Sequence, residues 1–552
     1  MVSQSPVCPA YLHPQKVRSE RGSGLSDIRV DGAAWINVEL YNDLSVDASI
    51  IMVDVPSVVP GTAPRTGGGV NMALQKIVNA RELKDSDYRP RTAQEHLKDE
   101  ITSRLSKYRE KGYSREEAMA LLFPRTIIDP EVLESLLAAI IGGSHLLLFG
   151  PSGTGKTSIA KDLWTLFPGE VYVVKDCPVQ DDPMSVVDPA YNSRVPCCPS
   201  CVARFKREGE DFDPARVDPS KVPVAVFSLR EGYGLARVQG SSEVFPDNLT
   251  GVFNLHKLEE LGDPTSPLIL EPGKLLQANR GLLMVDEVGK LPLGTQNVLL
   301  QALQEGIVTP AKSRETFPAR FVAVTTSNLR DLDAINEPLN DRLGNIYIDY
   351  IRDHMKNRAI IETAIPDRFE NMFFPEMLVH AAVFSVEAWR DLSVDIPELS
   401  EVGSNRTMLD SITRSIAFSV LKDERAISRD SFERGVRDAF YSRIRARGGD
   451  SFLRNEEVVR EYLRGNLELA VERGFRVYWC TFFQKELKGS TERAEKLVKG
   501  MAGGRVPPSA DGALLRSFVL RMERHCGSLS EDEVVDSVVS MMNTMKDFGC
   551  KE

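Results

Sequence analysis

The chain has 552 residues, 79 acidic against 68 basic, with a formal net charge of -11 and an apolar fraction of 42%. This length accommodates three or four ordinary domains. The sequence has no run of about 18 uncharged apolar residues and no basic segment followed by an apolar run at its start, so we expect a soluble cytoplasmic protein without a membrane span. The acidic balance gives no general attraction to phosphate backbones, which disfavours a nucleic acid partner.

Residues 1–122 are expected to form a small N-terminal region of mixed α and β structure. Its first part alternates apolar runs, such as AAWINVEL and ASIIMVDVPSVV, with Gly, Pro and Ser, which predicts a few strands. The stretch RTAQEHLKDEITSRLSKYREKG follows, with apolar residues at Leu97, Ile101, Leu105 and Tyr108. These spacings of three and four predict an amphipathic helix that ends at the glycine.

From residue 123 the pattern becomes that of an α/β core with a parallel sheet. A helix leads into the apolar strand SHLLLF, and a glycine-rich loop and the helix TSIAKDLWTLF follow. The loop consists of Gly150, Pro151, Ser152, Gly153, Thr154, Gly155, Lys156 and Thr157. It fits the pattern G-x-x-x-x-G-K-[ST], in which backbone N–H groups and the lysine bind the phosphates of ATP and the final hydroxyl ligates Mg²⁺. A chance glycine turn is the alternative, and the flanking strand and helix speak against it.

Two further apolar stretches end in polar residues suited to ATP hydrolysis. RGLLMVDEVGKL ends its apolar run at Asp286 and Glu287, and ARFVAVTTSN ends at Asn328. Because parallel strands present their carboxyl ends at one edge of a sheet, we expect these side chains beside the loop. Asp286 is then suited to hold Mg²⁺, Glu287 to polarise the attacking water and Asn328 to orient it. Alone, each would be read as a turn residue.

These motifs, in this order, resemble those of an AAA+ ATPase. Several further stretches resemble the branch that contains the magnesium chelatase ATPase subunit and the MoxR-like proteins: FPRTIID, EPGKLLQANRGLLMVDEV, SRETFPARFVAVTTSN and LNDRLG. The resemblance covers about residues 123–450. It implies a nucleotide-binding core over 123–352 and a helical lid over 353–450, and the pattern of residues 451–552 predicts a helical C-terminal region.

The resemblance also assigns roles to two arginines. Arg342 in LNDRLG occupies the position of the finger that one subunit presents to the ATP site of its neighbour, although Leu343 replaces the usual Phe. Arg406 in GSNRT matches the sensor-2 position, from which an arginine reaches the γ-phosphate within its own subunit. A surface salt bridge is the alternative for either side chain. A finger acting in trans implies a homo-oligomeric ring, which we expect to be a hexamer.

Two insertions are expected within the core, at about residues 177–215 and 240–275. The second contains turn residues around the apolar run TGVFNL, which predicts a hairpin or short helix where the branch carries its pore-side insertion; a surface loop is the alternative. The first contains Cys177, Cys197, Cys198 and Cys201. Cys198 and Cys201 form a C-x₂-C pair, and the cluster fits structural Zn²⁺, reduced buried thiols or redox chemistry.

The leading hypothesis is a Mg²⁺-dependent ATPase that acts as a motor, remodelling a partner protein or driving a metal-insertion complex. A von Willebrand-type or chelatase-like protein is the expected partner. A motor acting on nucleic acid is the alternative, but the second insertion carries no basic stripe. A nucleotide-dependent scaffold is a third hypothesis, against which Glu287 and Arg342 speak.

Overall fold

The computed structural model describes most of the chain from residue 77 to residue 441. The described residues are 77–364, apart from 264–265, 311–312 and 314, together with 379, 382–387, 389–390, 403–424 and 428–441. The strands predicted before residue 77 and the helical region predicted for 451–552 lie outside the described residues. Among those described, none of the helices combines the length and apolar character needed to cross a bilayer.

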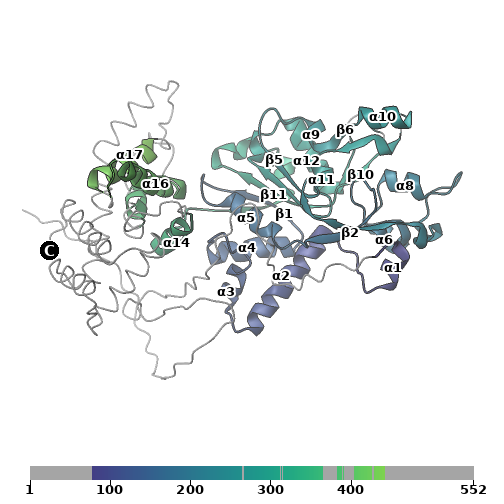
Figure 1. Ribbon diagram of the computed structural model, residues 1–552, viewed down its shortest axis with the longest axis horizontal. Coiled ribbons are helices and arrows are strands. Elements are labelled where there is room, and N and C mark those ends of the chain that lie inside the picture. The colour runs from purple at the N-terminus through teal and green to yellow at the C-terminus, as the bar shows by residue number, and fades with distance from the viewer. Residues whose placement is uncertain are drawn as a thin grey trace, which may run out of the picture. The chain divides into compact units, whose positions relative to one another are not determined.

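A six-stranded sheet, in which all pairings are parallel, forms the centre of the fold (Figure 1). In spatial order its strands are β12 Leu343–Tyr347, β1 His145–Phe149, β11 Val322–Ser327, β8 Leu282–Asp286, β5 Gly234–Gln239 and β4 Arg230–Glu231. Every residue of β8 and of β11 is buried, as expected for strands covered on both faces. The three apolar strands predicted around the loop, the acid pair and Asn328 are therefore confirmed as β1, β8 and β11.

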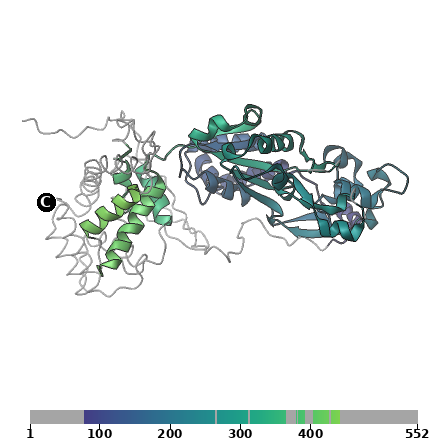
Figure 2. The ribbon, with the colours of Figure 1, turned by 90° about the horizontal axis from the view of Figure 1, so that it is seen from above.

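Helices cover both faces of this sheet, so the core has three layers (Figures 1 and 2). One face is covered by α2 Ala93–Glu110, α3 Arg115–Ala120, α4 Pro130–Ile141 and α5 Lys156–Trp164. The other is covered by α11 Lys274–Gln277, α12 Leu293–Glu305 and α13 Glu337–Asn340. Successive side chains of a strand point to opposite faces, so Leu146 and Leu148 join the first cluster and Leu147 the second.

Helix α2 is the amphipathic helix predicted in the N-terminal region. Thr92 caps its first turn in a capping box with Glu95, and Leu97 and Ile101 are fully buried. These two residues share one hydrophobic cluster with α4 and β1. The described part of the N-terminal region, which also includes the short helix α1 Ala80–Asp85, therefore packs directly against the α/β core.

The two insertions form compact additions to the core. In the first, β2 Glu170–Val174 pairs antiparallel with β3 Val224–Ser228. The chain between them forms α6 Pro183–Val187, α7 Pro189–Arg194, α8 Pro199–Phe205 and the 3₁₀ turns η1 Pro214–Arg216 and η2 Pro219–Lys221. The second runs through α9 Pro246–Thr250, β6 Gly251–Phe253, α10 Leu255–Leu261, η3 Pro267–Ile269 and β7 Leu270–Pro272. Because β6 and β7 pair antiparallel around α10, the predicted hairpin is confirmed and carries a helix as well.

The remaining elements connect the core and begin the lid. In the core these are η4 Val288–Lys290, η5 Leu329–Ala334 and the antiparallel pair β9 Ile307–Val308 and β10 Phe317–Pro318. In the lid they are α14 His354–Ala364, α16 Asn405–Leu421 and α17 Arg429–Tyr441. Figure 2 shows α16 and α17 side by side, where a Cβ on Gly435 would lie 2.3 Å from Oγ of Ser415. The described parts of the predicted lid are therefore helical.

Candidate nucleotide-binding site

The glycine-rich loop lies between β1 and α5, with its backbone turned toward the first turn of the helix. Gly155 is the N-cap of α5 with φ 87°, and Gly153 has φ 82°, conformations that glycine adopts without strain. A Cβ on Gly153 would also lie 3.0 Å from Cβ of Ser404, the residue that caps α16. The loop therefore combines free helix N–H groups, which favour an anion, with close contact to the lid.

Lys156 extends across this loop. Its Nζ donates hydrogen bonds to the carbonyl oxygens of Gly150, at 2.9 Å, and Pro151, at 2.6 Å. Burial, and to a smaller extent the charge of Arg406, lower the pKa of Lys156 to about 8, while Glu287 acts in the opposite direction. The loop therefore holds a cation whose charge is costly until an anion binds.

This pKa predicts a pH dependence of nucleotide binding. Without nucleotide, Lys156 is mostly protonated below pH 8 and increasingly neutral above it. Phosphate favours the protonated form, so we expect the affinity for ATP to fall by up to about tenfold per pH unit above pH 8. Titration with a fluorescent ATP analogue at pH 7.5 and 9.5 measures this, and any binding retained by Lys156→Arg should be insensitive to pH. Equal wild-type affinity at the two pH values would contradict the assignment.

Asp286, at the end of β8, contacts the hydroxyl that follows the loop lysine. Its Oδ1 accepts hydrogen bonds from Oγ1 of Thr157, at 3.1 Å, and Oγ1 of Thr326, at 3.4 Å. Its Oδ2 accepts from Nε and a terminal nitrogen of Arg237, at 3.1 and 2.6 Å. The two oxygen ligands predicted for Mg²⁺ are thus brought together, and hydroxyl and carboxylate oxygens are the donors that this ion prefers.

Glu287 adopts an uncommon backbone conformation, with φ 56°. Its backbone N–H donates to Oγ1 of Thr326, and a Cβ on Gly240 would lie 2.1 Å from its carbonyl oxygen. Its carboxylate accepts hydrogen bonds from Nδ2 of Asn328, at 3.2 Å on Oε1, and from Nζ of Lys290, at 2.9 Å on Oε2. The predicted pair of Glu287 and Asn328 is therefore brought together from two adjacent strands.

Sequence reasoning did not identify two further polar residues of this site, Arg237 and Gln239. Both lie on β5, and Nε2 of Gln239 donates to Oε2 of Glu287 at 3.2 Å. The register opposes Gln239 to Asp286 and Arg237 to Met284. The signal in the sequence was the alternation of Arg237 and Gln239 in GLARVQ, which places both on one face of a strand.

The two predicted arginines, Arg406 and Arg342, lie in different surroundings. Arg406 is the second residue of α16, and its Cγ lies 3.7 Å from the Cβ position of Gly153, next to the loop. Arg342 lies exposed between α13 and β12, and in the part of the chain that the structure describes it forms no ion pair. Arg406 is thus brought to the loop of its own subunit, whereas Arg342 is presented to solvent.

The cysteine cluster is separate from this site and differs from its predicted composition. The Sγ atoms of Cys177, Cys198 and Cys201 gather with a carboxylate oxygen of Asp181, all within 4.8 Å of one another. Cys197, the fourth sulfur that the sequence predicts as a ligand, is not among these four residues. Cys198 caps α8 in an extended conformation, so its neighbour points away, and Sγ of Cys197 instead accepts from Nδ2 of Asn192 at 3.8 Å. Burial raises the pKa of the Cys197 thiol.

A phosphate-binding loop after β1, an acid pair after β8 and an asparagine after β11, on neighbouring parallel strands, define an AAA+ ATPase core. Comparison with known families agrees, because the family model described as the PrkA AAA domain matches residues 143–390. Over these residues the chain is similar to AAA+ ATPases, and its curated relatives are ATPase subunits of magnesium chelatase.

Curated relatives in this branch are similar at modest identity. The magnesium-chelatase subunit ChlI of Cyanophora paradoxa is 29% identical over 231 residues, which cover 42% of this chain and 54% of that protein. The chloroplastic subunit ChlI-1 of Arabidopsis thaliana is 25% identical over 349 residues, covering 60% and 72%. The chain spans about half the length of most curated relatives that it matches. A solved complex of magnesium chelatase subunits BchI and BchD is 24% identical, with TM-score 0.29, covering 57% of this chain and 92% of that one.

Proposed function

We propose that this chain hydrolyses ATP in a Mg²⁺-dependent reaction and uses the energy as a motor on a partner protein. The observation that carries the proposal is the convergence of two contacts beside Lys156. Thr157 meets Asp286 at 3.1 Å, and Asn328 meets Glu287 at 3.2 Å. The first pair can hold a metal ion and the second can hold a water molecule, which are the two requirements of phosphoryl transfer to water.

The loop from Gly150 to Thr157 binds the phosphates in this proposal. Lys156 exchanges its carbonyl partners for the β- and γ-phosphates, and the N–H groups at the start of α5 face the same anion. Thr157 and Asp286 hold Mg²⁺, which neutralises charge on the phosphate oxygens. Arg237 balances the charge of Asp286 without nucleotide, and its side chain is 45% exposed, so it can leave the carboxylate toward solvent.

Glu287 acts as the base that polarises the attacking water. Asn328 orients Oε1, while Lys290 and Gln239 hold Oε2. As a carboxylate, Glu287 can accept a proton from the attacking water, and Nζ of Lys290 lies 2.9 Å from its Oε2. Arg406 reaches the γ-phosphate from the lid of the same subunit.

The motor acts as a ring in this proposal. An exposed Arg342 serves as the finger for the site of the next subunit, which requires a head-to-tail assembly; we propose a hexamer. The related magnesium chelatase and the resemblance to MoxR-like proteins make a von Willebrand-type or chelatase-like protein the proposed partner. We place the ring in the cytoplasm, where the cysteines stay reduced.

The second insertion favours a protein as the client over a nucleic acid. It exposes the apolar side chains of Phe245, Val252 and Leu255, with 63, 47 and 72% of their surface accessible. The one lysine or arginine in the described hairpin from β6 to β7, Lys257, pairs with Glu271 at 3.8 Å. A surface that binds phosphates would instead present clustered, unpaired cations.

Phosphate release by the full-length protein tests the proposed activity. We expect hydrolysis in the presence of Mg²⁺ and none with EDTA. Thr157→Val, which removes the hydroxyl but keeps the shape, should lower the rate by roughly tenfold or more and raise the Mg²⁺ requirement, because one ligand is lost. Thr157→Ser keeps the hydroxyl and is the matched control. Absence of hydrolysis in the wild type, or equal rates for Thr157→Val and Thr157→Ser at limiting Mg²⁺, would contradict the proposal.

A further inference from the structure

We propose that Cys177, Cys198, Cys201 and Asp181 form a structural Zn²⁺ site that is distinct from the nucleotide site. The four candidate ligand atoms lie within 4.8 Å of one another. Sγ of Cys177 and Sγ of Cys198 are 3.7 Å apart. A tetrahedral zinc ion with Zn–S bonds of about 2.3 Å separates two sulfur ligands by about 3.8 Å, whereas a disulfide requires about 2 Å. The spacing therefore fits a metal centre and excludes a disulfide.

The buried carboxylate of Asp181 is the second observation that points to a cation. Asp181 is 4% exposed, and its Oδ2 accepts a hydrogen bond from the backbone N–H of Cys198 at 2.7 Å. A buried carboxylate is strongly disfavoured unless a cation or metal compensates its charge. The nearby guanidinium of Arg280 pairs with the next residue, Asp182, at 2.9 Å. A metal ion among the three sulfurs supplies the charge that Asp181 requires.

Backbone groups around the cluster are directed at its sulfur atoms. The N–H of Asp181 donates to Sγ of Cys177 at 3.3 Å, and the N–H of Cys201 donates to Sγ of Cys198 at 3.4 Å. The second bond spans the C-x₂-C pair and turns both side chains inward, as in the ligand pairs of structural zinc sites. Such bonds fix the direction in which the two sulfur atoms point, as the ligands of a metal centre require.

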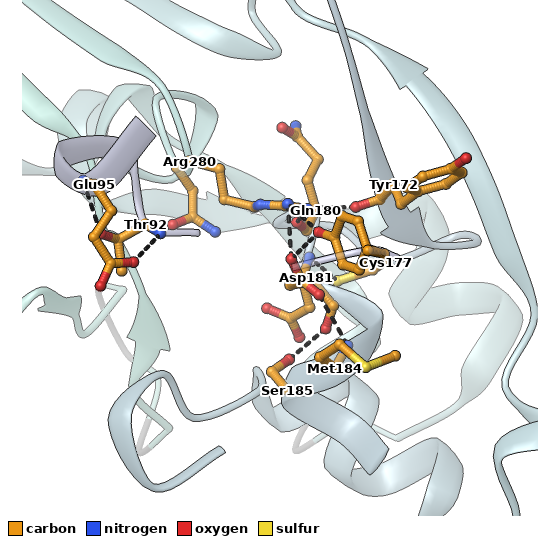
Figure 3. A network of polar contacts seen from close by, with 12 residues as sticks. Thr92, Glu95, Tyr172, Cys177, Gln180, Asp181, Met184, Ser185 and Arg280 are labelled. Atoms are coloured by element: carbon orange, nitrogen blue, oxygen red, sulfur yellow. Dashed lines mark hydrogen bonds and ion pairs between the residues drawn. The ribbon is translucent and has the colours of Figure 1, made fainter. Parts of the chain in front are cut away.

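A surrounding network holds the segment that carries Asp181 against the core. Arg280 donates to the carbonyl oxygens of Tyr172 and Gln180, and Nδ2 of Asn279 donates to the carbonyl of Val179 at 2.7 Å. Figure 3 shows Arg280 reaching toward Gln180 and Asp181, with Cys177 beside them. Arg280 precedes β8 by two residues. These contacts fix the backbone that leads to Asp181, so the segment that positions the proposed ligand runs directly into β8, the strand with the acid pair at its end.

The ligand set and its burial identify the kind of metal and its role. Thiolates select soft or borderline ions, and tetrahedral coordination by three thiolates and one carboxylate suits Zn²⁺. Cys198 and Cys201 are fully buried, and four protein ligands would complete a tetrahedral zinc site and leave no position for a substrate. The metal therefore acts as a cross-link, joining the end of β2 to the start of α8 across the first insertion.

Adjacent cysteines provide a matched pair of variants. Full-length protein purified without chelator under anaerobic conditions should carry about one Zn²⁺ per chain by mass spectrometry of the metal. Cys198→Ser and Asp181→Asn should each lower that content by tenfold or more. Loss of a ligand is expected to reduce the metal affinity by more than loss of a residue that only contacts a ligand, which costs roughly 10–100-fold. Cys197→Ser, one residue away and also buried, should keep the full content. Binding of a fluorescent ATP analogue by all three variants verifies that they fold and keeps this test independent of ATP hydrolysis.

Replacement of the metal by Co²⁺ reports the ligand set directly. Wild type and Cys197→Ser should give the same intense visible bands of tetrahedral Co²⁺ and the same thiolate charge-transfer bands, and Cys198→Ser should lose charge-transfer intensity. Wild type that binds neither ion, iron in place of zinc, a Cys177–Cys198 disulfide in the anaerobically purified protein, or loss of metal in Cys197→Ser to the same extent as in Cys198→Ser would each overturn the site.

Discussion

Glu287→Gln is expected to leave ATP bound and to slow its hydrolysis by about 10²–10⁴-fold, the usual contribution of a general base. The amide keeps the shape of the side chain and can still accept a hydrogen bond from Asn328, which now contacts Oε1 at 3.2 Å. It cannot accept a proton from water. Lys156→Ala is expected instead to abolish nucleotide binding, because it removes the cation that the loop holds against its own carbonyls.

Two measurements separate these roles. Titration with a fluorescent ATP analogue should give wild-type affinity for Glu287→Gln and no saturable binding for Lys156→Ala. Single-turnover hydrolysis should be slowed by that factor in Glu287→Gln and absent in Lys156→Ala. Gln239→Ala is the control, because Gln239 hydrogen-bonds the Glu287 carboxylate but is not the proposed base. This variant should reduce the rate much less than Glu287→Gln. Hydrolysis by Glu287→Gln at the parent rate would show that another group is the base.

Continuous motifs made the catalytic side of this site predictable. The loop from Gly150 to Thr157 is one uninterrupted stretch, and Asp286 and Asn328 end apolar runs that could hardly be anything but buried strands. Parallel strands expose their carboxyl ends at one edge, so their proximity followed from the sequence alone. The contact of Thr157 with Asp286 spans 129 positions and still required no further information.

Residues that reach the site only because of which strand pairs with β8 could not be predicted in this way. Arg237 reaches Asp286 only because β5, rather than the earlier strand β2, lies beside β8. The strand after the loop helix, β2, pairs instead with β3 in a separate sheet. That choice depends on how the first insertion folds, and local patterns carry no information about it.

The membership of the cysteine cluster could be predicted only in part, for a related reason. The spacing along the chain predicts four sulfur ligands. A residue can bind the metal only if its side chain points toward it, and Cys197 points away from its neighbour Cys198. Asp181 was not predicted as a ligand, because it lies in a stretch rich in aspartate and proline where nothing in the sequence distinguishes it. Only its burial, at 4% exposure, distinguishes it from the exposed acidic residues that the chain has in excess.

Arg342→Ala is expected to lower the ATPase rate by about 10³–10⁵-fold, the range measured when an arginine finger is removed, while leaving ATP binding intact. The side chain is exposed and forms no ion pair within the described residues, so its loss should not destabilise the subunit. Its effect requires a neighbour. Arg352→Ala, which removes an arginine that is 93% exposed and only weakly paired to Asp349 at 4.0 Å, is the matched control and should retain the wild-type rate.

Mixing two inactive variants tests whether Arg342 acts across a subunit interface. Arg342→Ala subunits keep an intact ATP site, and Glu287→Gln subunits keep an intact finger and still bind ATP, so both should enter rings. In an equal mixture about a quarter of the interfaces pair an intact site with an intact finger, and activity should return to that extent. No recovery on mixing, full ATPase activity of a demonstrated monomer, or equal rates for Arg342→Ala and Arg352→Ala would each contradict a finger acting in trans.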